Sequence, residues 1–311
     1  MESGIVKPAF KGNLFALTLV VFQLVAAQFI IPPLAKQFGL GTVMILNQFI
    51  FLILPLIIYF LFTRENLKKT LKFNKVYASE VLIMILIALL SQPIAGICAY
   101  ISSFFSENVV SQVVQSLNGI PYFQLISIMA VTPAICEELT MRGVILSGAK
   151  NHNIIKASIV NGLIFGMIHL TGSQLLYATF LGIIFAYIVR ITNSIFSSCI
   201  IHLVFNGFNM SVGYFSGKLL ENQDIASQVE DAAINSSSIA EIIFLGLIAI
   251  LAVYIIILLI GSIKRKRIRL EGEEVMNLRI LGDPIAAKND PIINLPFIIL
   301  VLLYLVIMFL L

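Results

Sequence analysis

Long apolar segments recur along the whole chain, and they limit its fold more than any other feature. Each is about 20 residues long, the length that an α-helix needs to cross the roughly 30 Å hydrocarbon core of a bilayer. We expect membrane spans at residues 13–35, 42–63, 78–101, 121–147, 154–170, 173–191, 194–213, 239–262 and 293–311. The strands of an outer-membrane barrel would instead be short segments of alternating polarity. The sequence therefore predicts an all-α, polytopic integral membrane protein with about eight or nine transmembrane helices.

The composition agrees with this class and excludes a soluble enzyme. Of the 311 residues, 59% are hydrophobic and only 12% are charged, whereas about 25% of the residues in a soluble domain are charged. In a membrane protein, an excess of basic residues such as the one behind the net charge of +4 reflects which loops lie in the cytoplasm. No nucleic-acid partner is expected. Cys98, Cys136 and Cys199 lie in apolar segments without the spacing of a metal site, so we expect them to be small buried hydrophobic residues.

The basic residues predict the orientation of the spans. With the N-terminus in the cytoplasm, every Lys and Arg except Lys36 and Lys218 falls on the cytoplasmic side, as the positive-inside rule requires. The basic run at 264–269 is expected to stop transfer and to contact anionic lipids. Residues 214–238 are predicted to form an exposed outer loop with a short amphipathic helix, and residues 264–292 a polar inner segment with Asp-Pro turns.

A single membrane domain is expected over residues 1–311. Its catalytic core is predicted at residues 121–213, with flanking helices and loops at 1–120 and 214–311. The predicted location is a multi-pass position in a membrane, most simply the bacterial plasma membrane. No oligomeric state is predicted.

Few strongly polar side chains lie within the predicted spans, and function is expected there because burying them in lipid is costly. They are Glu137, Glu138 and Arg142 in the fourth span, His169 at the end of the fifth, and His202 and Asn206 in the seventh. Glu138 and Arg142 are four residues apart on one helix face, where they can form an ion pair. Glu137 is rotated from Glu138 by about 100° and can face a separate cavity.

The remaining polar residues, Glu137, His169, His202 and Asn206, can support one type of chemistry. A carboxylate in a low-dielectric cavity has a raised pKa, which suits a general base that takes a proton from water. One histidine could orient that water, and the other, with a nearby amide, could stabilise an oxyanion. The set therefore predicts hydrolysis of an acyl bond, most naturally a peptide bond.

Other interpretations of these residues stay open at this point. A glutamate and two histidines could bind zinc with an open fourth position, although no HExxH motif is present and an obligatory metal is not expected. Glu137, His169 and His202 could form the proton or ion pathway of a transporter. The polar residues could also be interhelical hydrogen bonds in a non-catalytic scaffold or immunity protein. The Gly162-x-x-x-Gly166 motif is interpreted as a close helix-packing face.

Three motifs follow one another on successive predicted helices. They are Glu137-Glu138-x-x-x-Arg142, Phe165-x-x-x-His169 and His202-x-x-x-Asn206. This ordered set resembles the CPBP family of intramembrane proteases, which includes the CAAX prenyl endopeptidases and the bacteriocin-processing and self-immunity (Abi) proteins. The likeness covers roughly residues 121–213.

The resemblance implies an intramembrane glutamate-type endopeptidase that acts on a membrane-associated or lipidated protein or peptide. By this likeness, Glu137 is the general base and His169 is its partner at the water. His202 and Asn206 would stabilise the oxyanion, and the supporting residues would be Glu138, Arg142 and Phe165. No cofactor is expected, and zinc is the divalent metal that such a set would bind if the enzyme used one.

The depth of the site sets a condition on the helices. His169 follows about 15 residues of the fifth span, whereas Glu137 lies less than two turns from Arg142 near the cytoplasmic end of the fourth. The two depths match only if the fifth helix starts low or is tilted, or if the fourth extends into the cytoplasm. We expect a water-filled cavity that opens on the cytoplasmic side.

Overall fold

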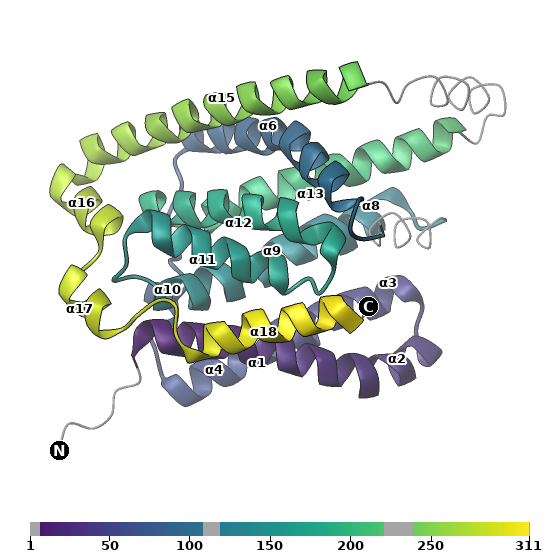
Figure 1. Ribbon diagram of the computed structural model, residues 1–311, viewed down its shortest axis with the longest axis horizontal. Coiled ribbons are helices and arrows are strands. Elements are labelled where there is room, and N and C mark those ends of the chain that lie inside the picture. The colour runs from purple at the N-terminus through teal and green to yellow at the C-terminus, as the bar shows by residue number, and fades with distance from the viewer. Residues whose placement is uncertain (1–6, 108–118, 221–238, 311) are drawn as a thin grey trace.

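The computed structural model describes residues 7–107, 119–220 and 239–310 (Figure 1). Within these residues, seven helical segments are long and apolar enough to cross a membrane: Pro8–Phe29, Leu40–Thr63, Ala78–Ser102, Tyr122–Gly148, Gly172–Thr192, Ile195–Lys218 and Ala240–Glu271. Two shorter apolar helices, α11 (Ile154–Met167) and α18 (Leu295–Leu310), occupy the other two predicted spans. The predicted all-α, polytopic fold is confirmed, and the chain is an integral multi-pass membrane protein.

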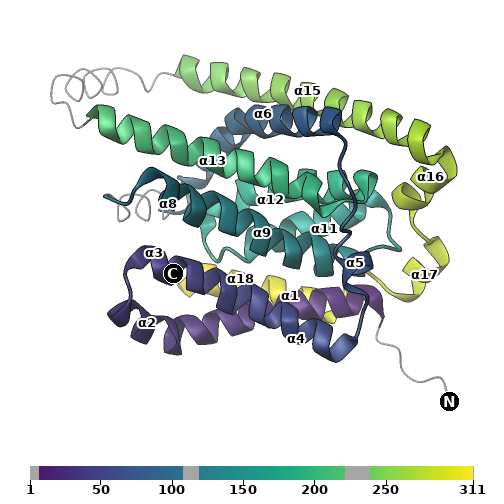
Figure 2. The same cartoon turned by 180° about the vertical axis from the view of Figure 1, so that it is seen from behind.

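Three groups of helices lie one above another (Figures 1 and 2). The lower group in Figure 1 contains α1 (Pro8–Phe29), α2 (Ile31–Gln37), α3 (Leu40–Gln48), the π-helix η1 (Phe49–Ile53), α4 (Leu54–Thr63) and α18. The middle group contains α8 (Tyr122–Ile126), the π-helix η2 (Ser127–Val131), α9 (Thr132–Glu138), the π-helix η3 (Leu139–Ile145), α10 (Leu146–Gly148), α11 and α12 (Gly172–Thr192). The upper group contains α6 (Ala78–Ser102), α13 (Ile195–Leu220) and α15 (Ile239–Glu271).

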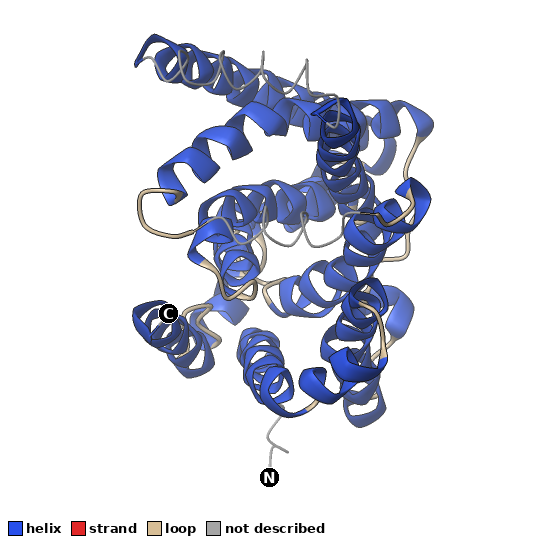
Figure 3. Cartoon of the chain, turned by 90° about the vertical axis from the view of Figure 1, so that its right-hand side faces the viewer, coloured by secondary structure: helices blue, strands red, loops and turns tan. Residues whose placement is uncertain are grey.

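Short helices connect these groups at one end of the bundle. α5 (Leu67–Thr70) leads from the lower group to α6, while α16 (Glu273–Leu281) and α17 (Pro284–Asn289) lead from α15 back down to α18. No strand occurs in the described part of the chain (Figure 3). Large apolar side chains cover the outside: Phe62 is 85% exposed and Phe309 95% exposed. Such a surface suits contact with lipid tails.

Two π-helical turns, η2 and η3, flank the α9 turn that carries Glu137 and Glu138. Pro133 explains the first turn, because proline lacks an N–H and its ring crowds the carbonyl of the residue four positions earlier, here Met129. The freed Met129 carbonyl accepts a hydrogen bond from Asn206 Nδ2 at 3.2 Å. Since π-turns are frequent at functional sites, this irregular helix marks the region where chemistry is expected.

The second π-turn also relies on side chains from other helices. The carbonyl of Arg142 accepts a hydrogen bond from Lys72 Nζ at 3.2 Å, and that of Met141 accepts one from Asn161 Nδ2 at 2.9 Å. Backbone carbonyls that leave the regular helical pattern inside a membrane need such partners. The irregular backbone of η3 is therefore stabilised by the surrounding bundle.

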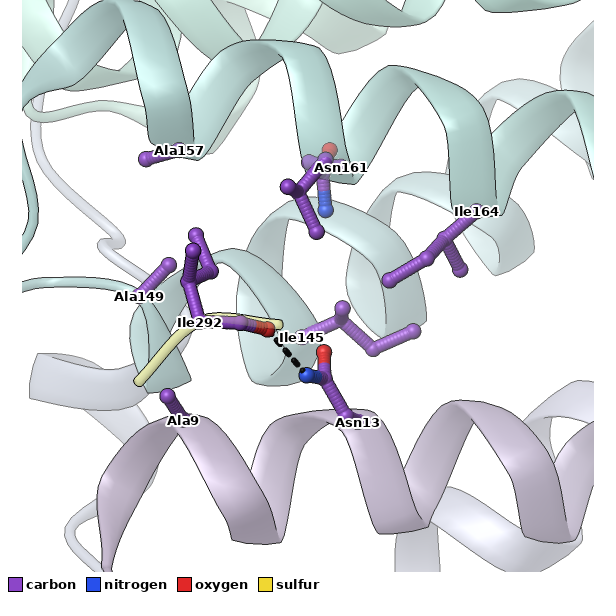
Figure 4. A pocket seen from close by; sticks show the side chains of 9 residues that line it. Ala9, Asn13, Ile145, Ala149, Ala157, Asn161, Ile164 and Ile292 are labelled. Carbon is purple, nitrogen blue, oxygen red and sulfur yellow. Dashed lines mark hydrogen bonds between the residues drawn. The ribbon is translucent and has the colours of Figure 1, made fainter. Parts of the chain in front are cut away.

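A water-sized cavity of about 10 Å³ lies between α1 and α11, where Asn13 and Asn161 face each other (Figure 4). Asn13 Nδ2 donates to the carbonyl of Ile292 at 2.8 Å. Asn161 Oδ1 is buried and has no partner among the described residues. A cavity needs roughly 10–15 Å³ to hold one water molecule, so nothing larger than a water molecule fits here. No titratable side chain lines this cavity, so it is a packing feature.

α11 is shorter than the predicted span at 154–170. Its 14 residues extend about 21 Å at 1.5 Å per residue, less than the roughly 30 Å of the hydrocarbon core. The helix ends before His169, and a turn connects it to α12. Glu137 and His169 line one cavity, so the two residues lie at similar depths in the bundle.

The inner segment at 264–292 is mostly helical, whereas the sequence predicted a polar segment with turns. α15 continues through Glu271, and α16 and α17 follow it. Arg267, within the basic run, is buried and donates two hydrogen bonds of 2.7 Å to the carboxylate of Glu80 on α6. It joins α15 to α6 and does not face lipid. Contact with anionic lipids stays a prediction for the exposed residues of the run, such as Arg265 and Arg269.

The boundaries of two further helices differ from those predicted. α1 begins at Pro8, earlier than the predicted start at residue 13, because the Asp290 carboxylate accepts a hydrogen bond from the backbone N–H of Ala9 at 2.6 Å. A cap from a residue so distant in the sequence cannot be predicted from local signals. α13 covers the beginning of the outer segment predicted as a loop at 214–238, and residues 221–238 of that segment lie outside the described residues.

The Gly162-x-x-x-Gly166 motif is a close helix-packing face, as predicted. A Cβ placed on Gly162 would lie 2.7 Å from the carbonyl oxygen of Thr179, and a Cβ on Gly166 would lie 2.7 Å from that of Leu175. Gly182 on α12 approaches Gly162 equally closely, since its Cβ would lie 2.8 Å from the Gly162 Cα. The backbones of α11 and α12 therefore touch, as small residues in membrane helices allow.

A Gly162→Leu substitution is expected to destabilise the protein by about 1–3 kcal/mol, because the new side chain meets backbone that cannot move aside. The measurement is thermal unfolding of the purified protein in detergent. Gly246→Leu is the matched control, since a Cβ on Gly246 of α15 has open space around it. An equal melting temperature for Gly162→Leu and the native chain would contradict the close contact of α11 and α12.

Candidate active site

The predicted ion pair between Glu138 and Arg142 is confirmed. Arg142 Nη1 donates to Glu138 Oε1 at 2.9 Å, and both side chains are fully buried. The guanidinium carbon lies 4.3 Å and 5.0 Å from the ring centroids of Phe165 and Phe185, and Nη2 donates to the carbonyl of Gly182 at 3.3 Å. These additional contacts offset part of the cost of removing two charges from water, although Arg142 Nε and Glu138 Oε2 have no hydrogen-bond partner among the described residues.

His202 on α13 connects the two adjacent glutamates. Its Nδ1 donates to Glu138 Oε1 at 2.9 Å, and its Nε2 lies 3.9 Å from Glu137 Oε2. Because an ionised carboxylate can only accept, Nδ1 carries a proton. The sequence had suggested an ion pair and a separate polar set, but Glu138 belongs to both. Glu138 therefore holds the ring of His202 in addition to pairing with Arg142.

His169 lies in the turn that follows α11. Its Nδ1 is 2.7 Å from the carbonyl oxygen of Phe165, so Nδ1 donates and Nε2 of the neutral ring is free to accept. The next residue, Leu170, has a φ of 55°, a left-handed conformation that bulky residues rarely adopt. Tyr304 Oη on α18 donates to the carbonyl of Thr171 at 3.3 Å. Contacts from α11 and α18 thus hold this strained turn, and they fix the orientation of the histidine.

Glu137 and His169 line one cavity of about 140 Å³. The opposite wall comes from the N-terminal helices and includes Gln23 on α1 and Asn47 and Gln48 on α3. Gln48 Nε2 donates to Glu137 Oε1 at 3.3 Å. Sequence reasoning missed these three amides, although their position within apolar spans was a usable signal.

Asn206 does not line this cavity, and neither does His202. Asn206 instead donates to the Met129 carbonyl that Pro133 frees from the helix. The structure therefore brings Glu137 and His169 to one cavity and places His202 beside Glu137, while it gives Asn206 a bond to the backbone. The catalytic roles of all four residues stay predictions.

Comparison with known proteins places the same region in a protease family. Residues 119–208 match the family described as type II CAAX prenyl endopeptidase Rce1-like. The family resemblance is confirmed. No curated protein and no solved structure matches the chain. The Rce1-like match supports a membrane protease of the CAAX-endopeptidase type.

The Rce1-like segment extends from α8 into α13 and so contains both glutamates and both histidines of the site. The other wall of the cavity, built by α1 and α3, lies outside the matched residues. A complete cavity therefore requires the N-terminal helices as well as the Rce1-like segment.

The expectation that the enzyme needs no metal stays a prediction. In the part of the chain that the structure describes, no three His, Cys, Asp or Glu side chains converge as metal ligands. His202 Nδ1 and Glu138 are engaged with each other, and Glu138 also pairs with Arg142. A catalytic zinc ion usually has three protein ligands free to bind it.

Proposed function

We propose that the protein is an intramembrane endopeptidase that uses water activated by Glu137 to hydrolyse a peptide bond of a membrane-associated or lipidated protein or peptide. One observation carries the proposal: Glu137 and His169 line a single cavity, and a buried ion pair orients His202 toward Glu137. The Rce1-like match supports the reaction class. We also assign roles in this reaction to Glu137, His169, His202 and Asn206.

In the first step, the Glu137 carboxylate takes a proton from a water molecule in the cavity. His169 Nε2, which is free to accept, hydrogen-bonds the other hydrogen of that water and orients it. The water oxygen bonds to the carbonyl carbon of the substrate, and the electron pair of the C=O bond moves to the oxygen. The product of this step is a tetrahedral intermediate with an oxyanion.

The oxyanion needs hydrogen-bond donors, and each such donor contributes about 3–4 kcal/mol in well-studied hydrolases. We assign this role to His202 Nε2, because the Glu138 carboxylate binds Nδ1 and holds the ring with Nε2 3.9 Å from Glu137 Oε2; Nε2 donates when the ring carries a proton on each nitrogen. Asn206, one turn along α13, has a second amide N–H besides the one bonded to Met129. When the C–N bond breaks, protonated Glu137 returns its proton to the leaving nitrogen.

The size of the cavity limits what part of the substrate enters it. Pockets for drug-sized ligands are roughly 300–1,000 Å³, whereas this cavity is about 140 Å³. A peptide unit and a water fit such a space, and a lipid anchor on the substrate would stay in the bilayer. We place the enzyme in a bacterial plasma membrane, where it would mature a secreted peptide or protect against a bacteriocin.

The test compares membrane peptidomes from cells that make the native chain and cells that make the Glu137→Gln variant at equal levels. We expect peptides with new termini only in the presence of the native chain. Identical peptidomes, combined with a Glu137-dependent proton flux in proteoliposomes, would show that the protein is a transporter and not a protease. A cellular function that survives loss of both Glu137 and His202 would instead indicate a non-catalytic scaffold.

A further inference from the structure

The cavity wall opposite Glu137 consists of amide side chains whose hydrogen-bonding capacity is largely unused. Gln23 and Asn47 line the cavity, and within the residues that the structure describes neither side chain has a hydrogen-bond partner. Gln48 donates to Glu137 through Nε2, while its Oε1 is buried and has no partner there. Within the described residues, Gln23, Asn47 and the Oε1 atom of Gln48 thus lack hydrogen-bond partners at one place in the bundle.

Three amides elsewhere in the spans each donate one hydrogen bond to a backbone carbonyl, unlike Gln23 and Asn47. Gln92 Nε2 donates to the carbonyl of Phe205 at 3.3 Å, and Asn209 Nδ2 donates to the same carbonyl at 3.0 Å. Asn206 Nδ2 donates to the carbonyl of Met129 at 3.2 Å. Gln23 and Asn47 are half-buried where they line the cavity, so their donors and acceptors are open to a ligand that enters it.

An extended peptide has the chemistry that such a wall would recognise. A substrate segment whose helix is unwound for cleavage exposes one N–H and one C=O per residue, and within a membrane these groups need partners from the protein. Each Gln or Asn side chain both donates and accepts, so it can bind either backbone group. The wall faces Glu137 and His169 across a cavity similar in size to the engineered cavities of about 150 Å³ that bind benzene.

We propose that Gln23, Asn47 and Gln48 form a subsite that binds the main chain of an extended substrate segment beside the scissile bond. This inference rests on the proposed protease function. Because the amides bind backbone groups, the subsite recognises an unwound conformation and tolerates many side chains. The N-terminal helices thereby supply substrate binding, and the Rce1-like helices supply the chemistry.

The test measures binding of a fluorescent peptide with a prenylated C-terminal CAAX sequence to the Glu137→Gln protein in nanodiscs. The peptide is also made with each backbone N–H methylated in turn. On the Glu137→Gln background, Gln23→Leu and Asn47→Leu remove one amide each, and Gln92→Leu is the matched control for an amide outside the cavity. Gln48 is left unchanged because it also contacts the residue at position 137. Melting temperatures verify that each variant is folded, and Gln23→Ala replaces Gln23→Leu if the latter fails to fold.

Methylation at one or two positions is expected to weaken binding roughly tenfold in the Gln92→Leu control, the effect of one lost hydrogen bond. At one of these positions, N-methylation should weaken binding less than about twofold in Gln23→Leu or Asn47→Leu. The amide side chain that accepts from that backbone N–H is already absent from the variant. Equal penalties in all variants would overturn the subsite and show that the amides bind only water.

Cleavage of the same peptide by the chain with Glu137 intact separates the two proposals. Glu137-dependent cleavage with an unchanged methylation pattern in Gln23→Leu and Asn47→Leu would retain the protease and overturn the subsite. Absence of both cleavage and binding would overturn both. Glu137-dependent cleavage, together with loss of the N-methylation effect in Gln23→Leu or Asn47→Leu, would support both the protease and the subsite.

Discussion

A Glu137→Gln enzyme is expected to hydrolyse its substrate 100- to 10,000-fold more slowly than the native chain, because general base catalysis typically contributes a factor of about 10² to 10⁴. The amide has nearly the same shape as the carboxylate but cannot take a proton from water. The bundle should remain intact, since Glu137 lies at the cavity and is not part of the buried Glu138–Arg142 pair. The measurement is kcat/KM for a peptide that the native enzyme cleaves, with melting temperature measured in parallel.

Glu274→Gln is the matched control for this substitution, because it makes the same chemical change on the exposed face of α16. We expect the control to keep full activity. If Glu137→Gln retained more than a tenth of native kcat/KM, another residue would have to activate the water. A chelator that abolished activity, with recovery on adding zinc, would contradict the metal-free mechanism independently of Glu137.

Hydropathy predicted every apolar helix of this fold, because crossing a bilayer requires a long run of apolar residues. It did not predict where α11 ends. The break before His169 depends on a left-handed residue, Leu170, and on Tyr304 of α18, which donates to the carbonyl of Thr171. Such long-range contacts leave no periodic signal in the sequence, and an unbroken apolar run was therefore interpreted as a longer helix.

The candidate site was predictable where its geometry is local. Spacing along one helix placed Glu138 against Arg142 and turned Glu137 away from both. The bond from His202 to Glu138 spans 64 positions in the sequence, so it depends on how α13 packs beside α9. Helical periodicity does not determine that arrangement.

Asn206 shows how a structural need and a catalytic role can share one residue. Pro133 widens the helix and frees the Met129 carbonyl, and Asn206 satisfies that carbonyl. Pro133 on α9 and Asn206 on α13 therefore act together, because the proline frees a backbone carbonyl and the amide binds it. The same bond fixes the orientation of the amide, so its second N–H has a defined direction in the proposed mechanism.

An Arg142→Met substitution is expected to destabilise the protein by about 3–5 kcal/mol, because Glu138 would be left as an unpaired buried charge. For a chain of 311 residues such a loss lowers the melting temperature by about 5–8 °C. Arg142 also loses its contacts with the Phe165 and Phe185 rings and with the Gly182 carbonyl. The measurement is thermal unfolding in detergent at neutral pH.

The double variant Arg142→Met with Glu138→Gln separates the charge from the packing. Removing both charges should recover much of the lost stability, because breaking a buried pair costs more than replacing it with neutral groups. Activity should not recover with it, since the Glu138 carboxylate that holds the His202 ring beside Glu137 is absent from the double variant. If the double variant were no more stable than Arg142→Met, packing of the guanidinium between the two rings would account for the stability, and the unpaired carboxylate would not. If its activity returned with its stability, the role of Glu138 in holding His202 ready for the oxyanion would be wrong.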